Sequence, residues 1–196
     1  YGEISDVCLK RKIRNRLQDA GEKILVQSDD RTDDGFDCIR ARVEGNPATK
    51  KSMDMKAKEA GRTKSLREAA CKEWIDVRTF GQVLAFKDDK KKGVDSVSVG
   101  VRGPLSIHAA VSLDPVAVTG MQITKSVNNE PGDKKGSDTM GMKHRVDFGV
   151  YKFQGSINVQ LAEKTGFSDE DAAKIKDALC TIFENDASSA RPEGSM

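Results

Sequence analysis

Residues 6–15 read DVCLKRKIRN, and with their neighbours they predict an amphipathic helix over residues 5–20. Leu9, Ile13 and Leu17 recur at the spacing of one helical face. Ser5 or Asp6 can cap the amino terminus of such a helix. The polar and basic side chains fall off the apolar stripe, so we expect a cationic face with Lys12 at its edge and with Lys10, Arg11, Arg14 and Asn15 on it.

The composition around this helix narrows the class of protein. In 196 residues, hydrophobic side chains make up 37%, charged ones 33% and aromatic ones 5%, with a net charge of +2. No apolar run approaches the roughly 20 residues of a membrane span, and the first residues do not read as a signal peptide. We therefore expect a cytoplasmic protein with no membrane partner. A basic helix on a nearly neutral chain suggests either a groove for a polyanion or an ordinary solvated face.

Cysteine spacing argues against a zinc site or a disulfide scaffold. The four cysteines lie far apart with no paired spacing, so we expect reduced, mostly buried thiols at Cys8, Cys38, Cys71 and Cys180.

Further elements follow from periodicity. Residues 53–74 predict a helical insertion on the surface, split at Gly61. Alternating valines predict a strand at 97–101, and residues 150–161 predict another. The last helix begins at Ser168, which forms a capping-box pattern with Asp171, and is expected to end near Asn185.

A long hairpin is predicted between residues 116 and 148. Residues 116–124 and 143–148 are strand-like, whereas the intervening residues 128–136 are polar and have no apolar face to bury. The order helix, insertion, strand, hairpin, strand, helix is typical of a βαββαβ ferredoxin-like domain without its end strands. We thus expect an α+β fragment lacking terminal strands.

Catalytic and metal-binding patterns are weak. His108 and His144 have no nucleophile nearby in sequence. The segment from Asp30 opens like an EF-hand loop, but Ala41 stands where the bidentate Glu is needed. We expect no catalytic residue, no metal site and no cofactor.

Three short motifs instead favour contacts with a nucleic-acid backbone. They are DVRTFG at 76–81, VRGP at 101–104 and TMGMKHR at 139–145. Arginine binds phosphate through two hydrogen bonds, glycine lets the backbone approach closely, and methionine is an adaptable apolar wedge. Each motif alone is more often structural, but together they favour RNA, with candidate contacts at Arg78, Phe80, Arg102, Lys125, Met140, Gly141, Lys143 and His144.

These motifs, in this order, resemble a known family. Residues 6–15, 76–83, 101–104, 139–141 with 143–144, and 161–168 are similar to the backbone subunit of the CRISPR surveillance complex Cascade, subtype I-C (the Cas-seven, or Csd-two, group of the RAMP superfamily). Two features depart from the family pattern: its opening strand is missing before Tyr1, and Met142 replaces a usually basic residue.

The resemblance implies an RRM-like palm over residues 1–21, 74–115 and 148–196, a helical finger over 22–73 and a hairpin thumb over 116–147. It also implies several copies polymerised along a guide crRNA, which pairs with target DNA, beside the large, small and repeat-processing subunits. Family members of this type are not catalytic, since a separate helicase-nuclease cleaves the target.

Three alternatives stay open at this point. The first is a metal-dependent ribonuclease, as in the backbone subunits of type III complexes, with Asp6 or an acid of residues 29–37 at the cleavage site. The second is an endonuclease that processes repeat RNA, for which the histidines supply no convincing cluster. The third is a filament-forming protein that binds no RNA.

Overall fold

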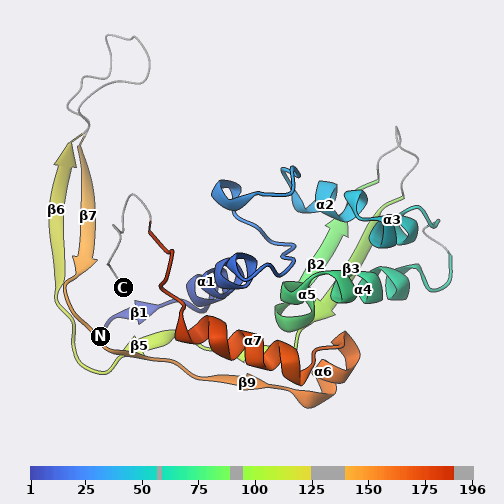
Figure 1. Cartoon of the computed structure of the whole chain (residues 1–196). Coiled ribbons are helices and arrows are strands. Elements are labelled where there is room, and N and C mark those ends of the chain that lie inside the picture. Colours follow the sequence, from blue (N-terminus) through green and yellow to red (C-terminus); the bar gives the residue numbers. More distant parts are fainter. Residues whose placement is uncertain (57–58, 89–94, 125–139, 188–196) are drawn as a thin grey trace, which may run out of the picture.

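The computed structural model describes residues 1–56, 59–88, 95–124 and 140–187. They combine helices with short antiparallel strands (Figure 1). The helices are α1 (Asp6–Asp19), the 3-10 helix η1 (Asp29–Arg31), α2 (Ile39–Gly45), α3 (Pro47–Met53), α4 (Arg62–Glu73), α5 (Ile75–Phe80), α6 (Val159–Thr165) and α7 (Asp169–Cys180). The strands are β1 (Glu3–Ile4), β2 (Gly81–Phe86), β3 (Val97–Arg102), β4 (Leu105–Ile107), β5 (Ala110–Ser112), β6 (Val118–Thr124), β7 (Met140–Val146), β8 (Tyr151–Lys152) and β9 (Gly155–Ile157).

The strands of the described residues form four small sheets. One has the order β1-β5-β8, and the others are the pairs β2-β3, β4-β9 and β6-β7, all antiparallel. The mixed α and β content agrees with the predicted class. The predicted order began with the first helix, but a short strand, β1, precedes it and pairs with β5.

α1 forms where the sequence predicts it. Ser5 caps the helix, its hydroxyl accepting a hydrogen bond from the Cys8 N–H at 3.3 Å. Leu9, Ile13 and Leu17 are buried in a core that α1 shares with α7 and β4. The predicted capping box between Ser168 and Asp171 is also present at the start of α7. α7 ends at Cys180 rather than near Asn185, because the following residues form turns that contact α1.

A second core lies on the other side of α5. It joins Leu25, α2, α3 and α4 to Leu84 of β2 and to the inward valines of β3. α5 contributes Ile75 to the first core and Val77 to the second, so this short helix lies between the two. The residue between them, Asp76, is thereby held in the interior.

Two sequence-based boundaries are wrong. The stretch 53–74 is not a surface helix: α3 ends at Met53, and α4 begins after Gly61 and buries Leu66 against the second core. The stretch 150–161 is not one strand either. It divides into β8 and β9, and α6 starts at Val159 because Asn158 caps it, accepting from the Leu161 N–H at 3.0 Å.

The cysteines are less buried than predicted. All four are free thiols, but only Cys71 is buried, whereas Cys8 is partly exposed and Cys38 and Cys180 are exposed. Burial raises the pKa of the Cys71 thiol to about 11. That thiol is therefore protonated near neutral pH and is a poor nucleophile.

β6 and β7 form the predicted hairpin arms. They pair from Val118 opposite Val146 to Thr124 opposite Met140, and they stand away from the helical body (Figure 1). The predicted polar tip, residues 128–136, lies outside the described residues.

Candidate nucleic-acid interface

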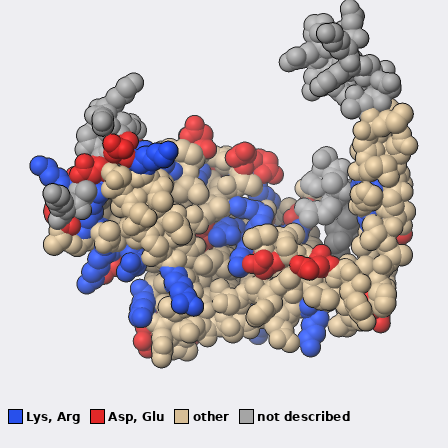
Figure 2. Space-filling view, turned by 180° about the vertical axis from the view of Figure 1, so that it is seen from behind, with Lys and Arg blue, Asp and Glu red and all other residues tan. Residues whose placement is uncertain are grey.

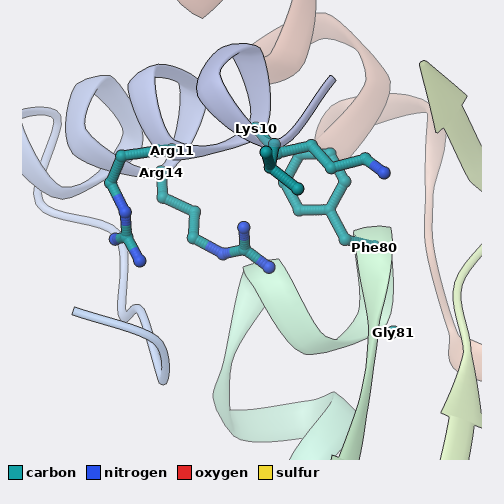
Figure 3. Close-up of a pocket in the computed structure, with 6 residues that line it drawn as sticks. Lys10, Arg11, Arg14, Phe80 and Gly81 are labelled. Carbon is teal, nitrogen blue, oxygen red and sulfur yellow. The ribbon is translucent and has the colours of Figure 1, made fainter. Parts of the chain in front are cut away.

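A groove of about 460 Å³ lies where α1 passes the junction of α5 and β2. Figure 3 shows the basic side chains extending from α1 and the aromatic ring of Phe80 lying beneath that helix. The lining residues are Val7, Lys10, Arg11, Arg14, Phe80 and Gly81. The groove thus combines three cations with an aromatic ring and a stretch of backbone that carries no side chain.

Arg14 is held from two sides. Its Nε donates a hydrogen bond to Asp76 Oδ2 at 3.1 Å, and its guanidinium carbon lies 4.8 Å from the centre of the Phe80 ring. Asp76 has no exposed surface and also accepts from the N–H groups of Leu25 and Val26, at 2.8 and 3.1 Å. A carboxylate this deeply buried requires such partners, so the position of Arg14 is set by the core.

Arg11 is neutralised less completely. Its Nη1 donates to the Val26 carbonyl at 2.7 Å, a neutral acceptor. Burial, followed by repulsion from Arg14, lowers the pKa of the Arg11 guanidinium. Two neighbouring guanidinium groups therefore share the local negative charge of Asp76, and an anion entering the groove would relieve their repulsion.

Lys10 completes the cationic wall. Its Nζ forms an ion pair with Asp6 at 2.9 Å, one helical turn earlier. The hydrogen bond and charge of Lys10 lower the pKa of the Asp6 carboxyl. Both side chains are substantially exposed, so water screens this pair and an anion can compete for Lys10.

Two glycines shape the floor of the groove. Gly81 has a left-handed φ of 80°, and a Cβ there would lie 2.3 Å from the Val101 carbonyl oxygen. A Cβ on Gly103 would lie 2.3 Å from the Thr79 carbonyl oxygen. The motifs at 76–81 and 101–104 therefore cross in backbone contact, and Arg102 is the register partner of Gly81. The exposed Arg102 therefore lies opposite the groove residue Gly81, but it does not itself line the groove.

Two predicted contacts lie elsewhere. Lys12 is buried on the opposite side of α1, where it pairs with Asp186 and lies 5.3 Å from the Phe183 ring. Arg78 turns away from the groove and binds Asp171 through two hydrogen bonds of 2.8 and 2.9 Å. In both cases an acidic residue far along the chain covers the cation. Asn15 does not line the groove, and its Oδ1 is buried without a hydrogen-bond partner among the described residues.

Four of the remaining predicted contacts lie together on β7, apart from the groove. Met140, Gly141 and His144 are exposed there and Lys143 is partly exposed, whereas Lys125 lies outside the described residues. In Figure 1 the hairpin stands apart from α1, α5 and β2. In Figure 2 its surface is mostly uncharged, while basic and acidic side chains intermingle over the helical body.

Sequence reasoning missed the residue that organises the groove. Asp76 begins the 76–81 motif, but the sequence pattern assigns it no role. Its only signal was a lone acid between apolar residues, WIDV at 74–77, which is unusual for a helix that both cores bury.

Over the described ranges, no helix is long and apolar enough to cross a membrane, and no three metal-ligating side chains are clustered.

The groove on this α+β chain has the chemistry of a surface for a phosphate-bearing polymer.

Sequence comparison identifies the family. The model of the family described as CRISPR-associated protein Cas7 matches residues 1–196, so the chain belongs to the Cas7 family. A "CRISPR-associated protein Cas7" of Haloferax volcanii is 26% identical over 196 residues, which cover 91% of this chain and 53% of that protein. The chain thus spans about half the length of this relative.

A solved structure of a "CRISPR RNA-guided surveillance complex, pre-nicking" contains a chain that is 15% identical, with a TM-score of 0.47. That likeness covers 98% of this chain and 64% of the other. Family membership confirms the broad resemblance found in the sequence.

Proposed function

We propose that this chain is a guide-RNA-binding backbone subunit of a CRISPR surveillance complex of subtype I-C, and that it binds RNA without cleaving it. Membership of the Cas7 family supports the backbone role. The observation that carries the RNA-binding part is the groove in which Arg11 and Arg14 approach each other with one buried carboxylate between them.

The groove suits the backbone of a single strand rather than base edges. Guanidinium groups bind phosphate oxygens in pairs, and a glycine floor allows the strand to approach closely. Phe80 already packs against Arg14, so its ring supports the arginine. Recognition of this kind is independent of base sequence, which fits a subunit that must hold any guide.

The hairpin has a separate role in this proposal. Met140 and Gly141 place an exposed thioether beside a backbone without a side chain, and Lys143 and His144 lie next to them. Such a surface can wedge between bases while cations offset the unstacking cost of about a few kcal/mol.

The wider assembly belongs to the same proposal. Several copies polymerise in the cytoplasm along the crRNA, whose bases pair with target DNA, and contact the large, small and repeat-processing subunits. The ferredoxin-like palm consists of residues 1–21, 74–115 and 148–196, the finger of 22–73 and the thumb of 116–147.

Titration of a fluorescein-labelled oligouridine RNA with the full chain tests the groove. Arg11→Gln/Arg14→Gln should bind at least about tenfold more weakly, and each lost phosphate contact should flatten the slope of log K against log[salt] by about 0.7. The matched control is Arg67→Gln/Lys176→Gln, which removes the same charge from exposed positions outside the groove. Equal losses in both variants would contradict a specific groove.

A further inference from the structure

The two arginines of the groove share one buried anchor. Asp76 Oδ2 accepts from Arg14 Nε and from the Val26 N–H, both at 3.1 Å. The carbonyl of the same Val26 accepts from Arg11 Nη1 at 2.7 Å. Hydrogen bonds on either side of the Val26 backbone therefore connect Asp76 and Arg14 to Arg11.

The anchor is rigid because of where α5 lies. Asp76 is 0% exposed, and its neighbours Ile75 and Val77 are buried in different cores. Its Oδ1 is occupied by the Leu25 N–H at 2.8 Å. Two backbone N–H groups thus hold the carboxylate, so it fixes the direction of a further donor bound to it.

The anchor uses only part of Arg14. Asp76 takes the Nε, and the part of the chain that the structure describes shows no hydrogen bond from the two Nη groups. Phe80 packs against the guanidinium plane at 4.8 Å and limits its rotation. The arginine is thereby held by its inner edge, with its outer donors available to a ligand.

We propose that Asp76 is a positioning residue for RNA binding, which orients Arg14 directly and Arg11 through the backbone of Val26 toward one phosphate-bearing strand. The inference rests on the proposed function of the groove. Asp76 does not touch the RNA, and it acts by reducing the freedom that two flexible cations lose on binding.

This role predicts in which direction neutralising Asp76 changes the affinity for RNA. A carboxylate near a groove for an anion repels that anion, so its neutralisation should strengthen binding if charge alone matters. If Asp76 positions the arginines, Asp76→Asn should weaken binding although it makes the protein more positive. A role confined to the fold would lower the melting temperature and leave the affinity of the folded protein unchanged.

The chain supplies a matched control. Asp171 is also buried, pairs with Arg78 and accepts from a backbone N–H, that of Ser168 at 3.1 Å, but it lies outside the groove. We expect Asp76→Asn to bind oligouridine RNA about tenfold more weakly and Asp171→Asn to bind within about twofold of wild type, since a charge-assisted hydrogen bond is lost at the groove in only one of them. Both titrations are carried out at a temperature below the melting temperatures of the variants.

Two further variants separate the possible failures. In an Arg11→Gln/Arg14→Gln background, where both positioned cations are gone, Asp76→Asn should have little additional effect on affinity. If Asp76→Asn does not fold, Arg14→Lys replaces it as the test: the charge remains, but a lysine has no planar fork to hold by one edge. Arg14→Lys should then lose about tenfold.

Unchanged or tighter binding by Asp76→Asn, or wild-type affinity of Arg14→Lys, would overturn the inference. If either of these results is found while Arg11→Gln/Arg14→Gln binds weakly, the groove remains the RNA site and only the role of Asp76 is rejected. Wild-type affinity of that double variant would instead remove the proposed function of the groove.

Discussion

Arginines in this chain differ in how completely the protein satisfies them. Arg42 donates to the Asp34 carboxylate and to the carbonyls of Leu25 and Phe36. Within the described ranges, Arg62 donates only to backbone carbonyls. These guanidinium groups are buried and act as cross-links between loops. Among the described residues, Arg14 makes one hydrogen bond, from its Nε to Asp76, and it lines the groove, so we expect its incompletely bonded guanidinium to bind a ligand.

The Arg78–Asp171 ion pair should make the stability of the fold depend on pH in the acidic range. Burial opposes ionisation of Asp171, but hydrogen bonds from Arg78 and the Ser168 backbone outweigh it and lower the pKa of the carboxyl below its ordinary 3.8. Because the folded pKa is depressed, the stabilisation is present above pH 3.8 and is lost as the pH falls through the folded pKa. Asp171→Asn should therefore flatten the fall in melting temperature below about pH 4, measured by circular dichroism.

Arg78→Gln provides the partner test for this pair. It should reproduce the flatter acid profile and lower stability by about 1–3 kcal/mol, because it leaves a buried carboxylate without its cation. A loss of RNA affinity with an unchanged melting temperature would contradict the structural role of Arg78.

The crossing of two elements determines whether the groove exists. At the α5–β2 turn, a Cβ on Gly103 would meet the backbone of Thr79, Phe80 and Gly81 at 2.3 to 2.4 Å, and backbone atoms there have no space to retreat. We expect Gly103→Ala to destabilise the chain by about 1–3 kcal/mol and to displace the groove floor. Chemical denaturation measures the first effect and RNA titration the second.

Gly100→Ala is the matched control, in the strand β3 that leads to Gly103. A Cβ at Gly100 meets nothing within 4 Å, so this substitution should change stability by less than about 1 kcal/mol. Equal destabilisation by the two alanines would show that loss of flexibility, rather than the close crossing, explains the effect.

The whole molecule combines an arginine groove in its body with a hairpin that stands apart from it (Figure 1). The hairpin exposes apolar side chains on both strands, among them Val118, Ile123, Met140 and Met142. A projecting arm with such a surface suits contact with a strand or protein outside its own body. This arrangement favours a binding subunit over a closed catalytic pocket.

Incubation with complementary RNA and Mg²⁺ distinguishes binding from the type III-like ribonuclease. We expect a guide RNA and its complement to remain uncut in the presence of the full chain, as measured on a denaturing gel. Asp6, the acid considered for cleavage, pairs with Lys10 at the rim of the groove. Cleavage that disappears in Asp6→Asn would contradict the non-catalytic proposal.

Local sequence determined the elements whose signal lies within one or two turns. α1 followed from the Leu9, Ile13 and Leu17 spacing with its Ser5 cap, α7 from its capping box, and β3 from alternating valines. The hairpin arms followed from two strand-like stretches around a polar segment. Such signals are readable because helical and strand periods repeat over neighbouring residues.

The use of each cation was decided by tertiary structure. Periodicity placed Lys12 at the edge of a basic face, but Asp186, 174 positions away, pairs with it inside the protein. Arg78 likewise pairs with Asp171, 93 positions away, and Asp76 reaches Arg14 across 62. A buried charge needs an opposite partner, and only the folded chain determines which acid arrives beside which base. For that reason the sequence indicated a basic surface, while the fold selected Arg11 and Arg14 as its centre.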